Sequence, residues 1–348
     1  MEFLARAVDL GYGYVKYSKG HLSASGDLPC DAFPSTAPQS YGYNDVDGGV
    51  MRGLDVIPVE IDGQTYHVGP QSLVAAPGLF SRMLDDSYFI SPQYLALFRG
   101  ALHYMGLPGR QVDSMVVGLP IKQYRNPAVI AHVQRQFSGT HVLPRRSMSL
   151  PERHVGITWV RVVPQTVGAL VAQSQAVGAA DRVPHETNLT IDVGYGTLQW
   201  MLSQGTAAVP ARCGYTMGGV SVLLQTMISS VDRSLTADPH MLDRFDKGLM
   251  DPAFVVKVDG KCIDMAPFRS RMRAMLGEHV ATMMRSVGRT SDVDNIFLCG
   301  GGAPRYLSLI QEAFPNRAVH AAAPAVSRFA NLRGFQVLSE LRCRLVPA

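Results

Sequence analysis

Short apolar runs alternate with longer amphipathic stretches along the whole chain, a pattern that predicts strands and helices in alternation. Strands are expected at residues 3–17 (two, around a turn), 56–61, 64–68, 112–119, 155–163, 188–193, 197–202, 295–298 and 317–320. Helices are expected at residues 91–106, 126–136, 166–180, 220–231, 267–287, 306–313 and 327–340. Because strands and helices alternate in both halves, the predicted fold class is α/β.

Local signals refine these elements. Ser91 and Pro92 are the residue types favoured at a helix N-cap and first position, and Gly106 is expected to end that helix. Asp62-Gly63 between two alternating runs predicts a hairpin turn. Residues 18–53, rich in Gly, Pro, Ser and Asp, are expected to be mostly loop, and the polar stretch 232–264 predicts a small peripheral subdomain.

Composition narrows the class of protein. The chain has 348 residues, 47% hydrophobic and 17% charged, which predicts about two domains with large cores. The net charge of +4 is too small to indicate a nucleic-acid groove, so no direct nucleic-acid contact is expected. Five scattered cysteines make a metal cluster or disulfide framework improbable and favour a cytoplasmic protein. No apolar run approaches the roughly 18 residues that span a bilayer, so no membrane partner is expected.

One short motif occurs twice. VDLGYGYVKY, residues 8–17, nearly recurs as IDVGYGTLQW, residues 191–200, and the Asp residues of the two copies are Asp9 and Asp192. Two glycines one residue apart let the backbone lie against a ligand without a Cβ in the way, and the N–H groups of such a turn can converge on an anion. An Asp beside that anion needs a cation between the two negative groups. The motif therefore indicates a phosphate in the turn and Mg²⁺, bound through water, between phosphate and Asp.

A single copy of this motif would be typical of a plain hairpin turn, but two copies at matching places favour two turns around one polyphosphate. Lys16 supplies a positive charge on the strand that leaves the first turn. Gly300-Gly301-Gly302 and Gly218-Gly219, each before a helix, are further places where a ring or phosphate can press on the backbone. A loose linker is the alternative interpretation of the triple glycine.

At this point the sequence resembles the actin-like ATPase superfamily. DLGYGYVK (9–16) resembles its phosphate-1 motif, VVGLP (116–120) the first connecting segment, DVGYGT (192–197) phosphate-2, LCGGGA (298–303) the adenosine motif, and RFANLRG (328–334) the second connecting segment. VVPQTVGAL (162–170) and YTMGGVSVLLQ (215–225) are most similar to the plasmid-segregation actins of the ParM/StbA type and their archaeal relatives.

The resemblance implies two domains, each built on a ribonuclease-H-like sheet, with ATP and Mg²⁺ in a central cleft. Domain I would comprise residues 1–164, with a peripheral subdomain at about 25–90 and the C-terminal helix 330–348 packed back on it. Domain II would comprise residues 165–329, with a peripheral subdomain at about 232–264.

The resemblance also implies roles for individual residues. Asp9 and Asp192 would hold the Mg²⁺-bound phosphates, and Gln165 would orient the attacking water, with Asp192 as proton acceptor. The alternative for Gln165 is a polar residue at a helix start without a chemical role. The residues expected to bind the nucleotide are Asp9, Gly11, Tyr12, Gly13, Tyr14, Lys16, Gly194, Tyr195, Gly196, Thr197, Gly218, Gly219, Gly300, Gly301, Gly302 and Ala303.

Two departures from the family pattern stand out. Gln199 occupies a position where many relatives carry a second Asp, and Tyr12 and Tyr195 stand where many carry a small or polar residue. The aromatic side chains are expected to point away from the phosphate. The function implied is an ATPase that polymerises into filaments and segregates plasmid DNA through an adaptor protein. The alternative is a sugar-type kinase of the same superfamily, for which Asp113 is the only modest candidate for a catalytic Asp in the first half.

Overall fold

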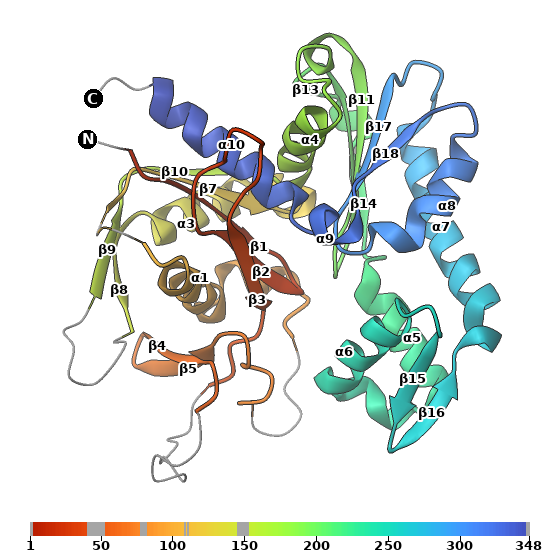
Figure 1. The fold of residues 1–348 in the computed structure, drawn as a ribbon, viewed down its shortest axis with the longest axis horizontal. Coiled ribbons are helices and arrows are strands. Elements are labelled where there is room, and N and C mark those ends of the chain that lie inside the picture. Colours follow the sequence, from red (N-terminus) through yellow and green to blue (C-terminus); the bar gives the residue numbers. More distant parts are fainter. Residues whose placement is uncertain are drawn as a thin grey trace. The chain divides into compact units, whose positions relative to one another are not determined.

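The computed structural model describes residues 3–39, 53–76, 82–107, 109, 111–144 and 153–345 (Figure 1). The chain folds into two compact units. Unit 1 comprises Met1–Leu119, Gln123–Pro164 and Leu332–Ala348, and unit 2 comprises Pro120–Lys122 and Gln165–Asn331. The backbone therefore passes between the units at residues 119–120, 122–123, 164–165 and 331–332.

Unit 1 is built on a five-stranded sheet in the order β10-β7-β1-β2-β3. The strands are β1 (Ala5–Leu10), β2 (Tyr14–Ser18), β3 (Cys30–Pro34), β7 (Ser114–Leu119) and β10 (Val160–Pro164). β1, β2 and β3 pair antiparallel, whereas β7 is parallel to β1 and β10 is parallel to β7. Every residue of β1 and β7 is buried, so these central strands form the core of the unit.

Helices α1 (Pro92–Tyr104) and α3 (Pro127–Phe137) pack on this sheet. Ser91 caps α1 by accepting a hydrogen bond from the backbone N–H of Tyr94, as the Ser-Pro pair predicts, and Gly106 follows in the left-handed conformation at φ 62°. Phe98 of α1 stacks on Phe137 of α3 with ring centroids 3.7 Å apart, which joins the two helices.

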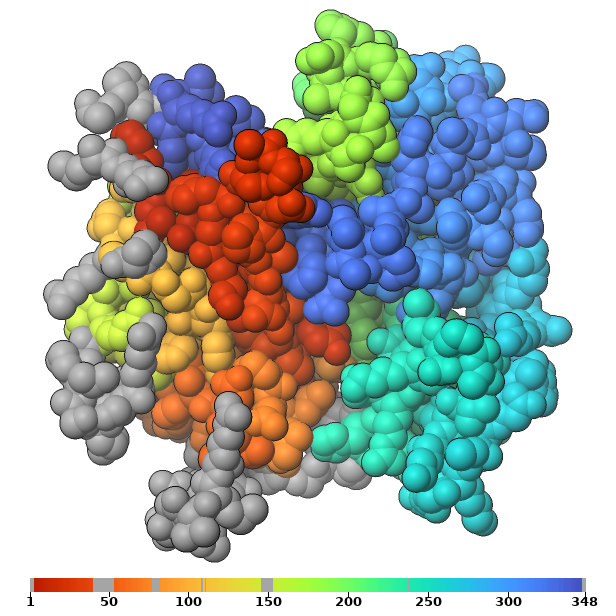
Figure 2. Space-filling view, in the orientation of Figure 1, coloured from red at the N-terminus to blue at the C-terminus, as the bar shows by residue number. Residues whose placement is uncertain are grey.

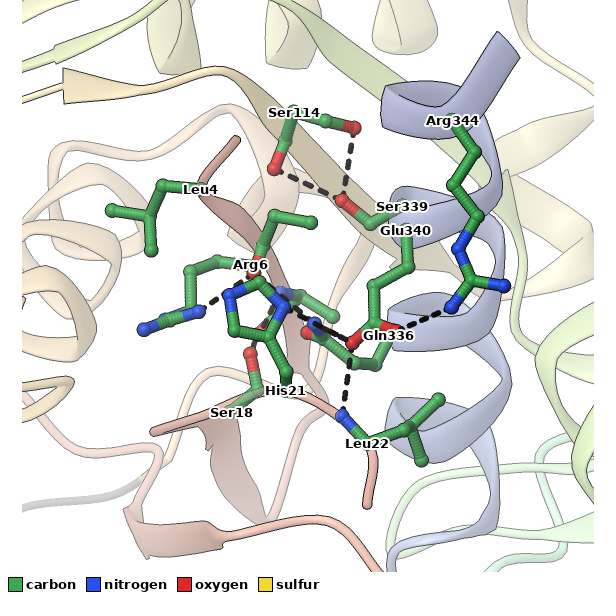
Figure 3. A network of polar contacts seen from close by, with 12 residues as sticks. Leu4, Arg6, Ser18, His21, Leu22, Ser114, Gln336, Ser339, Glu340 and Arg344 are labelled. Carbon is green, nitrogen blue, oxygen red and sulfur yellow. Dashed lines mark hydrogen bonds and ion pairs between the residues drawn. The ribbon is translucent and has the colours of Figure 1, made fainter. Parts of the chain in front are cut away.

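The C-terminal helix α10 (Ala330–Leu345) is tied to unit 1 by a buried polar network (Figure 3). Gln336 Nε2 donates to the carbonyl of Ala5 at 3.1 Å and to Glu340 Oε1 at 2.8 Å. The same carboxylate accepts from the backbone N–H of Leu22 at 2.9 Å and lies 3.4 Å from His21 Nδ1. Glu340 thus joins the last helix to the loop that follows β2.

Two further small sheets complete unit 1. β4 (Ile57–Ile61) and β5 (Gln64–Val68) form the hairpin that Asp62-Gly63 predicts, and both turn residues have positive φ. The other sheet has the order β6-β9-β8, with β6 (Gln111–Val112), β8 (Gly139–Leu143) and β9 (Arg153–Ile157).

One strand prediction in unit 1 was wrong, and the stretch expected to be mostly loop contains one strand. The single strand expected at 155–163 is two strands, β9 and β10, in different sheets, because the chain leaves one sheet at Thr158-Trp159 and enters the other. The loop expected at 18–53 contains β3, which pairs with β2 through its backbone despite the flanking prolines. Part of that loop, residues 40–52, lies outside the described residues.

Unit 2 repeats the topology of unit 1. Its main sheet has the order β13-β12-β11-β17-β18, with β14 also paired to β12. The strands are β11 (Thr187–Val193), β12 (Leu198–Gln204), β13 (Ala207–Ala208), β14 (Gly214–Thr216), β17 (Asn295–Cys299) and β18 (Val319–Ala321). As in unit 1, an antiparallel hairpin (β11–β12) adjoins two parallel strands (β17, β18). The repeat of the glycine motif thus falls on a repeat of the sheet.

The helices of unit 2 are α4 (Gln165–Ala176), α5 (Val220–Val231), α6 (Pro239–Gly248), α7 (Arg269–Val287), α8 (Ala303–Ala313) and α9 (Pro324–Ser327). α5 has the predicted bounds, whereas α8 begins three residues earlier than predicted. Residues 232–264 hold α6 and the hairpin β15 (Val255–Val258) and β16 (Lys261–Asp264). In the space-filling view this stretch lies among the green-blue atoms at the lower right (Figure 2).

The short helix α2 (Ile121–Tyr124) contains the place where the chain returns to unit 1. None of the helices in the described part of the chain is both long and apolar enough to cross a membrane.

Candidate functional site

The first glycine turn joins β1 to β2. Asp9, near the end of β1, is fully buried and lies opposite Lys16 in the strand register. Lys16 Nζ is 2.8 Å from Asp9 Oδ2, so the two residues form an ion pair. The N–H of Gly11 donates to the carbonyl of Tyr14 at 3.2 Å and closes the turn.

The backbone carbonyl groups of this turn accept hydrogen bonds from residues outside the turn. The backbone N–H of Ser35 donates to the Gly13 carbonyl at 3.0 Å, and Ser35 Oγ donates to the Gly11 carbonyl at 2.5 Å. Tyr88 Oη also donates to Gly11, at 3.2 Å. These bonds fix the backbone of the turn from residues far along the chain.

Tyr12, between the two glycines, is 5% exposed and belongs to an aromatic cluster. Its ring centroid lies 5.4 Å from that of Tyr88 and 5.2 Å from that of Phe89. This burial raises the pKa of the Tyr12 phenol well above its usual value. The side chain therefore packs in the core of unit 1, and only the backbone of Tyr12 can contribute to anion binding.

The second glycine turn joins β11 to β12 in the same way. Asp192 lies opposite Gln199 in the register, and the N–H of Gly194 donates to the carbonyl of Thr197 at 2.8 Å. In both turns, therefore, the first glycine bonds the residue three positions ahead. Asp192 is 2% exposed, and its Oδ2 accepts from Asn331 Nδ2 at 2.9 Å. Tyr195 is partly buried and packs against the core of unit 2.

The start of α5 is bonded to the second turn. The N–H of Val220 donates to the Gly194 carbonyl at 3.2 Å, and the N–H of Ser221 donates to the Tyr195 carbonyl at 2.8 Å. A Cβ on Gly219 would lie 2.4 Å from the backbone N of Thr197, so this position must remain glycine for the helix to meet the turn.

Gly218 has a different neighbour. A Cβ at this position would lie 2.5 Å from the ring of His279. Tyr306 Oη donates to the Gly218 carbonyl at 2.7 Å and lies 2.8 Å from His279 Nδ1. Internal packing is thus sufficient to explain both glycines, which the sequence had suggested for nucleotide contact.

The three glycines after β17 differ in how closely they approach the second turn. Gly300 has φ +94°, and a Cβ there would lie 2.3 Å from the Val193 carbonyl oxygen and 2.5 Å from Asp192 Oδ1. A Cβ on Gly302 would lie 2.5 Å from Val193 Cγ1. Gly301 alone of the three is exposed and has open space where a Cβ would stand. Gly301 is therefore the one of these three glycines that has space beside it for another group, and Ala303 is buried at the start of α8.

Gln165 is the first residue of α4 and is 6% exposed. Its Oε1 accepts a hydrogen bond from Gln199 Nε2 at 2.8 Å, and Gln199 Oε1 accepts from the backbone N–H of Ile121 at 2.6 Å. The sequence marked Gln199 only as a departure from a family pattern. Its contacts with Gln165 and Ile121 could not be predicted from the sequence, because residues 34 and 78 positions apart form no local sequence pattern.

Within each unit, the predicted residues come together as follows. Unit 1 places Asp9, Lys16 and the turn Gly11–Gly13 side by side, with Tyr14 opening β2. Unit 2 groups Asp192 with the turn 194–197, the loop 300–302 and, through Gln199, Gln165. The described residues include no group of three or more His, Cys, Asp or Glu side chains that could hold a metal on their own.

The chain was compared with known proteins. Residues 7–168 match the family model described as "Actin like proteins N terminal domain". No curated protein matches the sequence.

Among solved structures, the archaeal actin homolog Ta0583 in complex with ADP has 16% identity and a TM-score of 0.73, covering 98% of this chain and 100% of that one. Bacillus thuringiensis ParM with AMPPNP has 12% identity and a TM-score of 0.65, covering 99% and 100%. The Alp12 filament structure has 13% identity and a TM-score of 0.64, covering 97% and 99%.

The family model covers the first glycine turn and reaches the start of α4, and the structural likeness extends over nearly the full length of the chain. The duplicated mixed sheets, each with an antiparallel glycine hairpin beside parallel strands, are therefore the actin-like fold, and residues 7–168 are similar in sequence to the N-terminal domain of the actin-like proteins.

Proposed function

We propose that this protein binds ATP with Mg²⁺ through its two glycine turns, hydrolyses it, and uses the cycle to assemble and disassemble filaments of its own chain. We further propose that these filaments segregate plasmid DNA through an adaptor protein in the cytoplasm. The match of residues 7–168 to the actin-like family model and the actin-like fold support the proposal, and the geometry of the two turns carries it.

The main supporting observation is the equivalence of the two turns. Each has a buried Asp two residues before its first glycine, and each is closed by the same glycine N–H bond to the residue three positions ahead. A single hairpin turn has no need of a buried carboxylate at its entry, because an ionised carboxylate is costly to bury unless it is paired. Two such turns on equivalent strands are each suited to bind the oxygens of a phosphate group.

The similar structures add support at the level of the family. Ta0583 is seen with ADP and Bacillus thuringiensis ParM with AMPPNP, both nucleotides with a phosphate chain. Alp12 is seen as a filament. These ligands and this assembly belong to those proteins, and their extension to the present chain is part of the proposal.

The residues present fit a magnesium-bound triphosphate. Asp192 Oδ2 accepts a hydrogen bond from Asn331, and a Cβ on Gly300 would lie 2.5 Å from Asp192 Oδ1, so the glycine leaves space beside this carboxylate. Asp9 and Asp192 would hold the hydrated ion, which when bound would neutralise charge on the phosphate oxygens. Lys16 would balance the charge of the phosphates, the turn amides would bind phosphate oxygens, and Gln165 would align the attacking water. Because an amide is not a base, the proton of that water would pass to Asp192.

The kinase alternative gains no support from Asp113. Its Oδ2 accepts the N–H of Leu4 at 2.8 Å and its own N–H donates to the Leu4 carbonyl, at the start of β1. β7 is parallel to β1, so Asp113 lies at the opposite end of the sheet from the Gly11 turn. The six residues of β1 separate the two by about 20 Å at 3.3 Å per residue, too far for contact with a transferred phosphate.

The test combines sedimentation, light scattering and phosphate release with Mg-ATP. The wild-type chain should form sedimentable filaments and release phosphate, and Asp192→Asn should lose both. Asp294→Ala is a matched control, because Asp294 is exposed and bonds the Thr187 N–H at the other end of β11. Wild-type protein that neither pellets nor hydrolyses ATP would refute the proposal. Turnover only when a sugar is added, without filaments, would favour the kinase.

A further inference from the structure

A chain of three buried groups links Gln165 to a backbone amide. The Ile121 N–H donates to Gln199 Oε1 at 2.6 Å, and Gln199 Nε2 donates to Gln165 Oε1 at 2.8 Å. Gln199 is 1% exposed and Gln165 is 6% exposed, so water competes little for either bond. Hydrogen bonds between buried groups are strengthened by the low local dielectric, so these two bonds favour a single orientation of the amides.

The direction of this chain is fixed by chemistry. A backbone N–H can only donate, so the Gln199 atom that faces Ile121 must be the oxygen. The amide nitrogen of Gln199 then faces Gln165, which must present its own oxygen in return. Rotating either amide by 180° would place two donors, or two acceptors, against each other at hydrogen-bond distance.

Ile121 is itself held firmly. Its side chain is 6% exposed and packs in a cluster with Leu170 of α4 and Met201 of β12. It belongs to the short segment Pro120–Lys122, which is part of unit 2 although the chain on both sides belongs to unit 1. The backbone donor that sets both amide orientations therefore lies on a segment where the chain passes between the units.

We propose that Gln199 is a positioning residue for ATP hydrolysis, which fixes the amide of Gln165 with its carbonyl oxygen as the acceptor. The inference rests on the proposed function, because it needs Gln165 to orient the attacking water. A carbonyl oxygen has two lone pairs and can accept from a water as well as from Gln199. A water that donates to Gln165 keeps its own lone pair for the attack on phosphorus. A Gln165 amide turned the other way would instead donate to that lone pair.

Gln199→Glu tests this directly. A carboxylate still accepts the Ile121 N–H but has no proton to donate, so Gln165 must turn its NH₂ toward it. At pH 8 the rate of single-turnover phosphate release should fall at least about tenfold relative to wild type, as expected for a misaligned nucleophile. ATP affinity, measured by equilibrium titration, should stay within about threefold, because no nucleotide contact is removed.

The pH profile separates positioning from a general structural defect. A protonated Glu can donate again, so the rate of Gln199→Glu relative to wild type should recover several-fold as the pH falls from 8 to 5.5. Gln204→Glu, which places the same charge at the exposed end of β12, should match wild type throughout. A Gln199→Glu rate equal to wild type at every pH would overturn the proposal. So would a deficit that does not change with pH.

A double variant and a readout without nucleotide complete the test. Gln165→Ala should lower the rate, and adding Gln199→Glu should lower it no further, because Gln199 acts only through Gln165. In the nucleotide-free chain, amide hydrogen exchange at Ile121 should stay slow in Gln199→Glu and become faster in Gln199→Leu. Equal exchange in wild type and Gln199→Leu would show that the first bond is not made.

Failure of the underlying function gives a different pattern. If the wild-type chain hydrolyses no ATP, or if Gln165→Ala hydrolyses it normally, the role assigned to Gln165 is wrong. If Gln165→Ala is slow and Gln199→Glu is not, only the positioning role of Gln199 is refuted.

Discussion

Gly300 and Gly301 offer a matched pair of substitutions in adjacent residues. Gly300→Ala places a Cβ 2.3 Å from the Val193 carbonyl oxygen and 2.5 Å from Asp192 Oδ1, at a φ of +94° that L-residues rarely adopt. Gly301→Ala places a Cβ in open space, at a φ outside that region. The two variants change the same group of atoms and differ only in backbone strain and in neighbours.

The expected cost of Gly300→Ala has two parts. An unfavourable backbone conformation costs about 1–3 kcal/mol, and forcing a methyl group into a packed site costs about 1–3 kcal/mol more. The smaller freedom of alanine in the unfolded chain returns about 0.4–1 kcal/mol. Gly300→Ala should therefore destabilise unit 2 by about 3 kcal/mol, whereas Gly301→Ala should lie within about 0.5 kcal/mol of wild type or be slightly more stable.

Urea unfolding followed by tryptophan fluorescence measures this difference. The chain has two tryptophans, Trp159 in unit 1 and Trp200 in unit 2, so a Trp159→Phe background restricts the signal to unit 2. With a slope of about 1–3 kcal/mol per molar urea, Gly300→Ala should unfold about 1–3 M earlier than Gly301→Ala. Equal midpoints for the two variants would refute the steric argument. Gly301→Ala should keep its stability but bind ATP more weakly, if the ligand approaches the backbone there.

Three further predictions concern unit 1. Burial lowers the pKa of the His141 imidazole from 6.5 to about 4, so the unfolded chain takes up a proton that the folded chain does not. The free energy of unfolding should fall by up to about 3 kcal/mol as the pH drops from 6.5 to 4. Measured by urea unfolding across that range, the stability of His141→Gln should depend less on pH than that of wild type. Glu340→Ala should cost about 1–3 kcal/mol because it removes an acceptor from the buried Gln336 side-chain amide and from the partly buried N–H of Leu22. Thermal unfolding should show little change for Glu312→Ala, whose ion pair is exposed. Lys16→Met removes the charged partner of buried Asp9 and should destabilise the ligand-free chain by about 1–3 kcal/mol; a thermal shift no larger than that of Glu312→Ala would contradict this.

Much of the fold could be predicted because its signals are local. The Ser91-Pro92 start of α1, the Asp62-Gly63 hairpin and the bounds of α5 follow from residue types and periodicity within a few positions. The division of 155–163 between two sheets could not be predicted, because Thr158-Trp159 does not interrupt the apolar pattern. Where a strand changes partners is decided by tertiary packing, which periodicity does not record.

The candidate site shows the same limit. The two glycine turns could be found because the motif repeats in the sequence. A glycine in a sequence, however, does not say which atoms a Cβ would meet, so the contacts of Gly218 with His279 and of Gly219 with the second glycine turn could not be predicted. The contacts of Gln199 are long-range amide pairs, which have no periodicity and become visible only once β12, α4 and residues 120–122 are folded together.

The four passages between the units have a consequence for synthesis on the ribosome. Every segment of unit 2 has been translated by Asn331, whereas unit 1 still lacks Leu332–Ala348. Unit 1, whose translation begins first, is therefore completed last. At about 5–20 residues per second, β1 waits many seconds for Gln336, the residue that bonds the Ala5 carbonyl. A nascent chain arrested before α10 would hold a complete second unit and a first unit without its last helix, the state in which a chaperone would find most to bind.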